Sequence, residues 1–317
     1  MLVWLMVVLG LVILLLAGDM LVRGAVNLAL RVGIPALLVS LTIVAFGTSA
    51  PELLISLKAA AQDKPGLALG NVVGSNTANI LLVLGIPAIL ARMHTSHCDT
   101  RKSFVTMIGA TLLFILLALR GQFDLLAGVV LLSVLALILL DQGREALSHR
   151  RDGKAAEAEE EEVEGADPQM PWWKVALYLV LGLIGLPFGA SLLVDAASEI
   201  ARDYGVSETV IGLTLVALGT SLPELATTVM AALRRQADVA LGNVIGSNLF
   251  NLLAIIGITS LFKTIPVDLP ELTFDLAVML GASLLLIPFV FLRRDINRLW
   301  GIALSALYIL YVVIVLS

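Results

Sequence analysis

Long runs of apolar residues, separated by short polar or turn-rich stretches, fill most of the 317-residue chain. Several runs approach the roughly 20 residues that a helix needs to cross about 30 Å of hydrocarbon. The predicted fold class is therefore an all-α integral membrane protein. Interrupting the pattern at its charged and turn-forming positions predicts ten transmembrane helices, at residues 2–29, 35–62, 66–91, 102–119, 122–141, 172–200, 207–234, 238–262, 271–292 and 297–316.

The composition supports membrane embedding. Hydrophobic residues make up 59% of the chain and charged residues 14%, which is less charge than a soluble domain carries. The first apolar run has no basic start and no small-residue cleavage site, so we interpret it as a retained helix and not a signal peptide. The one cysteine, Cys98, excludes an intrachain disulfide.

The two halves of the chain repeat each other. Residues 33–86 align with residues 205–258 at a constant offset of 172, without a gap, and 25 of the 54 positions are identical. Shared hydrophobicity alone does not produce that identity. Because each half holds five predicted helices, an odd number, the second half must enter the membrane in the opposite sense. The sequence therefore predicts two inverted five-helix repeats.

A polar segment divides the repeats. The predicted organisation is a first repeat at 1–141, an acidic linker at 142–171 and a second repeat at 172–317. With both termini outside, the loops assigned to the cytoplasm hold thirteen Lys and Arg residues, and the outer loops hold four. Positive charge favours the cytoplasmic side. We therefore expect both termini outside and the central linker, including Glu157–Glu164, in the cytoplasm as a solvated tether.

Each repeat carries a GTS-x-PE segment within an apolar run, at Gly47–Glu52 and Gly219–Glu224. Proline has no N–H, so Pro51 removes the helical donor of the Gly47 carbonyl and opens the preceding turn. Freed carbonyls are costly in hydrocarbon unless something else satisfies them. Ionisable groups such as Glu52 are rare at such positions without a function. Hydroxyls, freed carbonyls and a carboxylate in one segment together indicate a cation-binding site.

A second segment, GNVVGSNTAN at Gly70–Asn79 and GNVIGSNLFN at Gly242–Asn251, follows each first one. Its glycines, four residues apart, predict a face that another helix can approach closely. Ser75 and Asn79 also share a helical face, as do Ser247 and Asn251. Ca2+ takes six to eight oxygen ligands. The segments offer only oxygen, without the His or Cys that Zn or Cu prefers.

These paired segments resemble the α-repeats of the Na+/Ca2+ exchanger branch of the Ca2+/cation antiporter superfamily, in its prokaryotic form, and the resemblance extends over essentially the whole chain. It implies a plasma membrane of a bacterium or archaeon, and a site centred on two glutamates with threonines contributing backbone oxygens. The implied metal ligands are Thr48, Ser49, Glu52, Ser75 and Asn79 in the first repeat, and Thr220, Ser221, Glu224, Ser247 and Asn251 in the second.

One departure from the family pattern concerns Asn251, where some prokaryotic members and the K+-dependent exchangers carry Asp. Two carboxylates then remain in the inferred site, which points away from K+ co-transport. The H+/Ca2+ exchanger branch typically adds a Glu after its Gly-Asn pair, and this chain has none there.

The resulting hypothesis is secondary active transport by alternating access. Two carboxylates are balanced by one Ca2+ or by two Na+, so the two ions compete for one site, and the family resemblance implies that the first and sixth helices move together. H+ coupling remains an alternative, because Glu can carry protons, and a passive cation channel is a more remote one. We expect no enzymatic activity, since HExxH, GxGD and GxSG motifs are absent. Besides Ca2+, Na+ and membrane lipid, we expect no cofactor, no nucleic acid and no obligate protein partner.

Two weaker signals lie outside the motifs. His94, His97, Cys98 and Asp99 cluster with irregular spacing, which favours a polar turn over a metal site. Asp19 and Arg23, four apart in the first helix, are expected to pair with each other.

Overall fold

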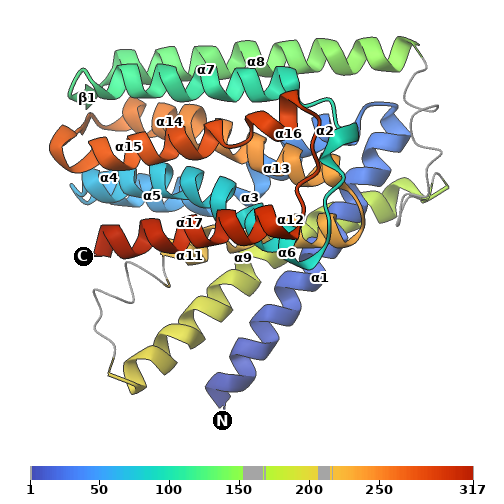
Figure 1. The fold of residues 1–317 in the computed structure, drawn as a ribbon, viewed down its shortest axis with the longest axis horizontal. Helices are drawn as coiled ribbons and strands as arrows, with labels where there is room; N and C mark the ends of the chain where they lie inside the picture. Colours follow the sequence, from blue (N-terminus) through green and yellow to red (C-terminus); the bar gives the residue numbers. More distant parts are fainter. Residues whose placement is uncertain (1, 153–166, 168, 206–214, 216, 317) are drawn as a thin grey trace.

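The computed structural model describes residues 2–152, 167, 169–205, 215 and 217–316, most of which are helical (Figure 1). The elements of the first half are α1 (Leu2–Val32), α2 (Ala36–Val39), the π-helical η1 (Ser40–Val44), α3 (Ala45–Thr48), α4 (Ala50–Ala61), α5 (Pro65–Ala78), the π-helical η2 (Asn79–Val83), α6 (Gly85–Leu90), the short 3-10 helix η3 (Thr95–His97), α7 (Arg101–Ala118), β1 (Gln122–Phe123) and α8 (Leu125–Asp152). Those of the second half are α9 (Trp172–Asp203), α11 (Ala217–Thr220), α12 (Leu222–Leu233), α13 (Ala237–Leu249), the π-helical η5 (Phe250–Ile255), α14 (Ile256–Phe262), β2 (Ile265–Pro266), α15 (Leu269–Leu284), α16 (Ile287–Phe291) and α17 (Arg298–Leu316).

The helices have the length and polarity of membrane spans. Among the described residues, eight helical segments are long and apolar enough to cross a membrane, and the pair Ala36–Thr48 and Ala50–Ala61, bent by 43°, makes a ninth. The predicted span 207–234 is described only in part, as α11 and α12. The all-α membrane fold is thus confirmed, although the described residues do not give the full count of ten.

The fifth predicted helix differs from the prediction at both ends. It begins at Leu125 rather than 122, because Gln122 and Phe123 pair with Pro266 and Ile265 as a short antiparallel ribbon. It also continues to Asp152, beyond the predicted end at 141. Residues 142–152 contain no proline and include several residues with high helix propensity, such as Arg, Glu, Ala and Leu. The α8 helix therefore extends past its apolar part. The acidic stretch Glu157–Glu164 lies outside the described residues.

The longest helices, α1 and α9, form a tilted pair along one side of the other helices (Figure 1). Glycines allow this close approach. A Cβ placed on Gly182 would lie 2.9 Å from the Leu21 Cα, and one on Gly10 would lie 2.9 Å from the Leu193 backbone nitrogen. The two helices therefore pack backbone to backbone.

The inverted relation of the halves is visible in how their connections pair. Phe123 pairs with Ile265 in the β1–β2 ribbon, and an isolated bridge joins Met93 to Ile296. Met93 and Ile265 are 172 residues apart, so they correspond in the two repeats. In Figure 1 the β1 ribbon lies at one end of the bundle, and η3 and α16, which flank the bridge, lie toward the other.

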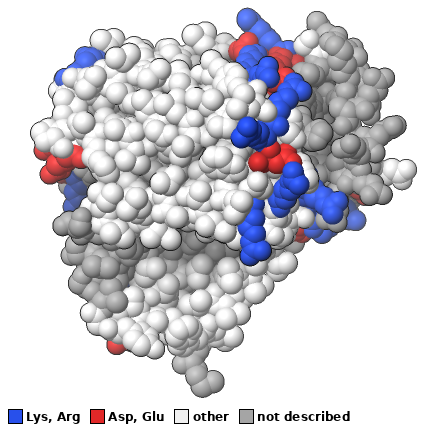
Figure 2. All heavy atoms as spheres, in the orientation of Figure 1, with Lys and Arg blue, Asp and Glu red and all other residues white. Residues whose placement is uncertain are grey.

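Charged side chains gather at one end of the visible face, where Figure 2 shows a band of Lys and Arg with interspersed acids. Ion pairs join separate elements of the two halves: Arg92 binds Asp295 at 2.9 Å, and His94 lies 3.3 Å from the same carboxylate. Hydrogen bonds from Ser96 and Arg92 outweigh the desolvation of Asp295 and hold the pKa of this carboxyl below its usual value. These contacts fasten the polar turn around η3 to the segment that precedes α17.

Candidate ion-binding site

The helices that carry the two motif glutamates are interrupted just before them. Ser49 and Ser221 leave the helical conformation, with φ, ψ of −83°, 4° and −87°, 3°. Pro51 and Pro223 stand in the first turn of the helices that follow, α4 and α12, a position that tolerates a missing N–H. The sequence predicted an opened turn, and the structure makes it a helix break.

Both glutamates are buried inside the protein. Glu52 is 1% exposed and Glu224 is fully buried. The Ser49 hydroxyl, three residues before Glu52 in the first half, donates to Glu224 Oε1 of the second half at 3.3 Å. Neither carboxylate points into the bilayer. The structure therefore brings together the two acidic groups that the sequence placed in separate repeats.

The other predicted site residues are buried as well. The Thr48 hydroxyl links the halves, since it lies 3.3 Å from Asn243 Oδ1 and 3.4 Å from the Ser247 hydroxyl. All ten predicted ligands have exposures of 6% or less: Thr48, Ser49, Glu52, Ser75, Asn79, Thr220, Ser221, Glu224, Ser247 and Asn251.

Two asparagines that the sequence interpretation did not assign a role support the glutamate helices. The Asn71 side-chain amide donates to the Glu52 carbonyl oxygen at 3.2 Å and to the Ser56 hydroxyl at 2.9 Å. The Asn243 amide does the same for Glu224 and Thr228, at 3.4 and 3.2 Å. These residues occupy the second position of each GN-V segment, so the repetition of the motif was a signal for them.

Four asparagine side chains join the two halves by hydrogen bonds. The Asn79 amide donates to Asn248 Oδ1 at 3.0 Å, and the Asn251 amide donates to Asn76 Oδ1 at 3.3 Å. Asn76 and Asn248 lie within the two motif segments, but the sequence predicted no role for them. The π-helical turns η2 and η5 cover Asn79 and Asn251, and such turns are frequent at functional sites.

Four buried acceptor oxygens remain without a hydrogen-bond donor, one from each motif segment. They are Glu52 Oε2, Asn79 Oδ1, Glu224 Oε2 and Asn251 Oδ1. A buried acceptor without a partner is unfavourable by about 1–3 kcal/mol, and by more when it is charged. The set has the hard oxygen chemistry that suits Ca2+ and Na+.

The glycine faces of the second segments differ from each other, although their sequences match. A Cβ on Gly242 would lie 2.9 Å from the Leu37 carbonyl oxygen, and one on Gly246 would lie 2.5 Å from that of Leu41. For Gly70 and Gly74, no described atom lies within 4 Å of such a Cβ. The predicted close helix approach is thus confirmed for the second repeat. For the first repeat it stays a prediction, because residues 209–213, the counterparts of Leu37–Leu41, lie outside the described residues.

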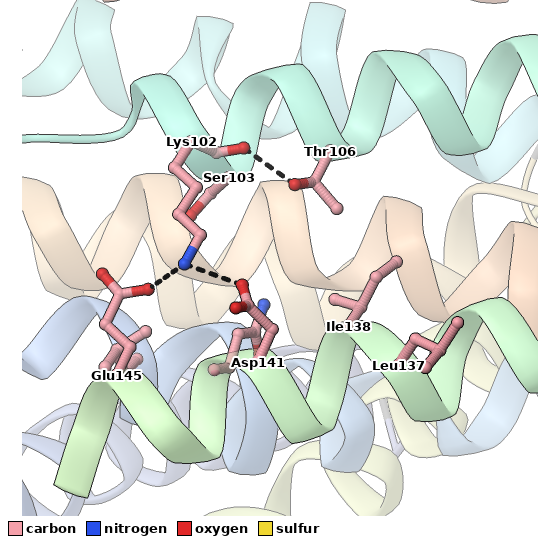
Figure 3. Close-up of a pocket in the computed structure, with 9 residues that line it drawn as sticks. Lys102, Ser103, Thr106, Leu137, Ile138, Asp141 and Glu145 are labelled. Atoms are coloured by element: carbon pink, nitrogen blue, oxygen red, sulfur yellow. Dashed lines mark hydrogen bonds and ion pairs between the residues drawn. The ribbon is translucent and has the colours of Figure 1, made fainter. Parts of the chain in front are cut away.

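A surface pocket between α7 and α8 offers a different cluster of charges (Figure 3). It has a volume of about 200 Å3, and Lys102 projects between Asp141 and Glu145, 2.7 Å from each carboxylate. Because the Lys102 ammonium already pairs with both acids, the pocket is poorly suited to hold a transported cation. Near η3, the Cys98 thiol donates to the His94 carbonyl oxygen. Burial raises the pKa of the Cys98 thiol well above its usual value, and the nearby Asp238 carboxylate raises it further.

Comparison with known proteins relates both repeats to one family. The profile described as sodium/calcium exchanger protein matches residues 2–142 and 174–317. CaxA of Alkalimonas amylolytica is 38% identical, over 96% of this chain and 96% of its own length. The sodium/calcium exchanger MaX1 of Methanosarcina acetivorans is 32% identical, over 98% and 97%. The solved structure of the sodium-calcium exchanger NCX_Mj soaked with 2.5 mM Na+ and 1 mM Sr2+ is 34% identical and superimposes with a TM-score of 0.81, over 99% of this chain and 98% of that one.

These relatives are named as exchangers, not enzymes, and they match this chain over nearly its full length. The family profile includes both motif pairs. The chain is a multi-pass membrane protein and a cation antiporter that belongs to the sodium/calcium exchanger family.

Proposed function

We propose that this protein exchanges Na+ for Ca2+ by alternating access at one buried site built on Glu52 and Glu224. The observation that carries the proposal is the set of four unpartnered buried oxygens, two carboxylate and two amide, contributed by the four motif segments. The remaining ligands would be oxygens of Thr48, Ser49 and Ser75, with their counterparts Thr220, Ser221 and Ser247, all of them buried.

Charge balance explains why the transported ions would exchange. Two carboxylates are neutralised by one Ca2+ or two Na+, so binding of one cargo displaces the other. An empty site would bury two uncompensated charges, which is costly in a low-dielectric interior. Reorientation of the unloaded protein is therefore disfavoured, and each half-cycle must carry an ion. If more than two Na+ move per Ca2+, each extra charge couples to the membrane potential by about 2.3 kcal/mol per 100 mV.

The pair α1 and α9 is the proposed moving part. These helices pack on each other through glycines, and α9 also lies against the glycines of both GTS segments: a Cβ on Gly47 would collide with Leu183 of α9, and one on Gly219 with Val194 of the same helix. A shift of the pair would thus act directly on the segments that hold Thr48 and Thr220. Inverted symmetry permits two mirror-related arrangements about a fixed site.

The choice of Na+ as the driving ion is supported by the names of the relatives, MaX1 and NCX_Mj, which are sodium/calcium exchangers. The proposed location is the plasma membrane of a bacterium or archaeon, with both termini outside and the central linker in the cytoplasm. The excess of Lys and Arg in the loops on the linker side supports this orientation.

The test is uptake of 45Ca2+ into proteoliposomes that contain the purified protein. We expect uptake to be driven by an outward Na+ gradient, to saturate with Ca2+, and to be stimulated by Na+ on the opposite side. Uptake that follows an H+ gradient and ignores Na+ would replace Na+ by H+ as the coupled ion. Uptake without saturation or trans-stimulation would identify a channel and refute exchange.

The site is tested by Glu52→Gln and Glu224→Gln, each of which removes one charge and preserves shape. Either variant should abolish Na+-dependent Ca2+ uptake. Glu145→Gln is the matched control, because Glu145 pairs with Lys102 at the surface of α7 and α8 (Figure 3) and should leave uptake unchanged. Full uptake by either site variant would remove that glutamate from the mechanism.

A further inference from the structure

Two methionines contact Asn76 and Asn248, two of the four asparagines that join the halves. The Asn76 amide nitrogen lies 3.7 Å from Met279 Sδ on α15, and the Asn248 amide nitrogen lies 3.7 Å from Met107 Sδ on α7. Both sulfurs and both amides are buried, with exposures of 1% or less. The geometry is that of N–H donors directed at thioether acceptors.

A thioether sulfur can accept a hydrogen bond but cannot donate one. An asparagine amide that faces it must therefore present its NH2 group, because the alternative places the amide oxygen against the sulfur lone pairs. With its NH2 toward Met279, Asn76 has its Oδ1 available to the Asn251 amide, which donates to it at 3.3 Å. Asn251 is then oriented with its own Oδ1 unpartnered and buried.

The same order of contacts occurs in the other half. Asn248 donates to Met107, Asn79 donates to Asn248 Oδ1 at 3.0 Å, and Asn79 Oδ1 is left unpartnered. Reversing any amide in either series would turn an NH2 group, instead of an oxygen, toward the cation. The orientation of each proposed amide ligand thus depends on a sulfur two side chains away.

Core methionines often serve only to fill irregular space. Here the two sulfurs stand at corresponding positions, since 107 and 279 differ by 172, and each receives the NH2 of the corresponding asparagine, 248 or 76. Filling of space does not require an amide donor at the same atom in both halves. The repeated contact indicates a polar role.

We propose that Met279 and Met107 are positioning residues that fix which atom of Asn251 and Asn79 faces the transported cation. This inference rests on the proposed function, because it assigns those amide oxygens to the ion. The two methionines are not equivalent. Asn248 donates to the Asn76 carbonyl oxygen as well, at 3.4 Å, whereas the described hydrogen bonds of the Asn76 NH2 go to Met279 alone. Met279 should therefore matter more.

The experiment measures the Kd of Ca2+ by isothermal titration calorimetry on the purified full-length protein, together with its Tm. Leucine keeps the size of methionine and removes the acceptor. We expect Met279→Leu to raise the Kd about two- to fivefold, as suits the loss of one weak hydrogen bond, and Met107→Leu to raise it less. Met93→Leu is the control: Met93 is 1% exposed, and no described hydrogen bond reaches its sulfur. Its Kd should equal that of the wild type.

A double-variant cycle separates positioning from packing. If Met279 acts through the amide of Asn251, then adding Met279→Leu to Asn251→Ala should not raise the Kd further. The inference is overturned if Met279→Leu leaves the Kd unchanged, or if its effect is the same in both backgrounds. Should the wild type bind no Ca2+ at all, the proposed function fails. Should Glu52→Gln abolish binding while Met279→Leu preserves it, only the role of the methionines fails.

Discussion

The unequal packing of two matching glycines gives a prediction with an internal control. Gly74 and Gly246 occupy the same place in the two GN-V-x-GSN segments. A Cβ on Gly246 would lie 2.5 Å from the Leu41 carbonyl oxygen and 2.6 Å from the Ala45 Cβ, whereas ordinary contact begins near 3.4 Å. Around Gly74 no described atom lies within 4 Å. Alanine should therefore be tolerated at one position and not at the other.

The magnitude follows from comparing the two variants. At Gly246 the added methyl requires a displacement of about 0.9 Å against backbone, and overpacking of this kind costs about 1–3 kcal/mol. The gain in helix propensity from Gly to Ala is about 1 kcal/mol at both positions and cancels in the comparison. Gly246→Ala should thus be about 1–3 kcal/mol less stable than Gly74→Ala. The assay is thermal unfolding of both purified variants in the same detergent.

Ca2+ uptake by Gly74→Ala should be affected even though its stability is not reduced. In a mirror-related arrangement, Ala217, the counterpart of Ala45, would approach Gly74 as Ala45 approaches Gly246. Gly74→Ala should then have a Tm at or slightly above that of the wild type, because of its gain in helix propensity, and should lose Na+-dependent uptake. Equal Tm values for the two variants would contradict the packing argument, and full uptake by Gly74→Ala would contradict the mirrored arrangement.

Three further predictions concern contacts outside the carboxylate pair. Asp19 pairs with Arg234, which caps the end of α12, as well as with Arg23 in α1. Asp19→Arg and Arg234→Asp should therefore each lower the Tm and slow uptake, and the double variant should recover part of both losses. No recovery in the double variant would show that the pair does not couple the helices. Asn243→Ala removes a donor to the Glu224 carbonyl and should cost about 1–3 kcal/mol in stability by thermal unfolding, so an unchanged Tm would contradict its supporting role. Asp124 accepts the Ala127 N–H at 2.9 Å, and this bond holds the pKa of Asp124 below its usual value. The Asp124 carboxylate therefore stabilises the fold above about pH 4, and this stabilisation is lost as the pH falls below that value. The Tm difference between wild type and Asp124→Ala should vanish in acid. A difference that persisted in acid would refute the capping role.

Much of the architecture could be predicted because it depends on local sequence. Apolar run length determines which segments can span a bilayer, and proline determines where a hydrogen bond is lost, so the spans and the interruption before Glu52 and Glu224 were predictable. The gapless repeat indicated inverted halves. Burial of both glutamates followed, since a paired acidic motif in apolar surroundings needs a shielded, hydrated or cation-filled environment.

Contacts between the halves could not be predicted from either half alone. The partners of Asn76 and Asn248 are a methionine on another helix and an asparagine of the opposite repeat, and no spacing along the chain encodes that meeting. The ion pair of Asp19 with Arg234 likewise joins residues 215 positions apart.

By itself the sequence determined an inverted pair of membrane-spanning repeats, each with one buried acid and its oxygen-rich neighbours, because hydropathy, proline and repetition act through neighbouring positions. Only the tertiary structure decided which oxygens lack a donor, which amides hold them in place, and which of the two matching glycine faces is closely packed among the described residues. The physical reason is that a single arrangement of an inverted-repeat protein breaks the symmetry that its sequence preserves. Hydrogen-bond partners and close contacts belong to that arrangement, and two nearly identical motifs can therefore have different surroundings.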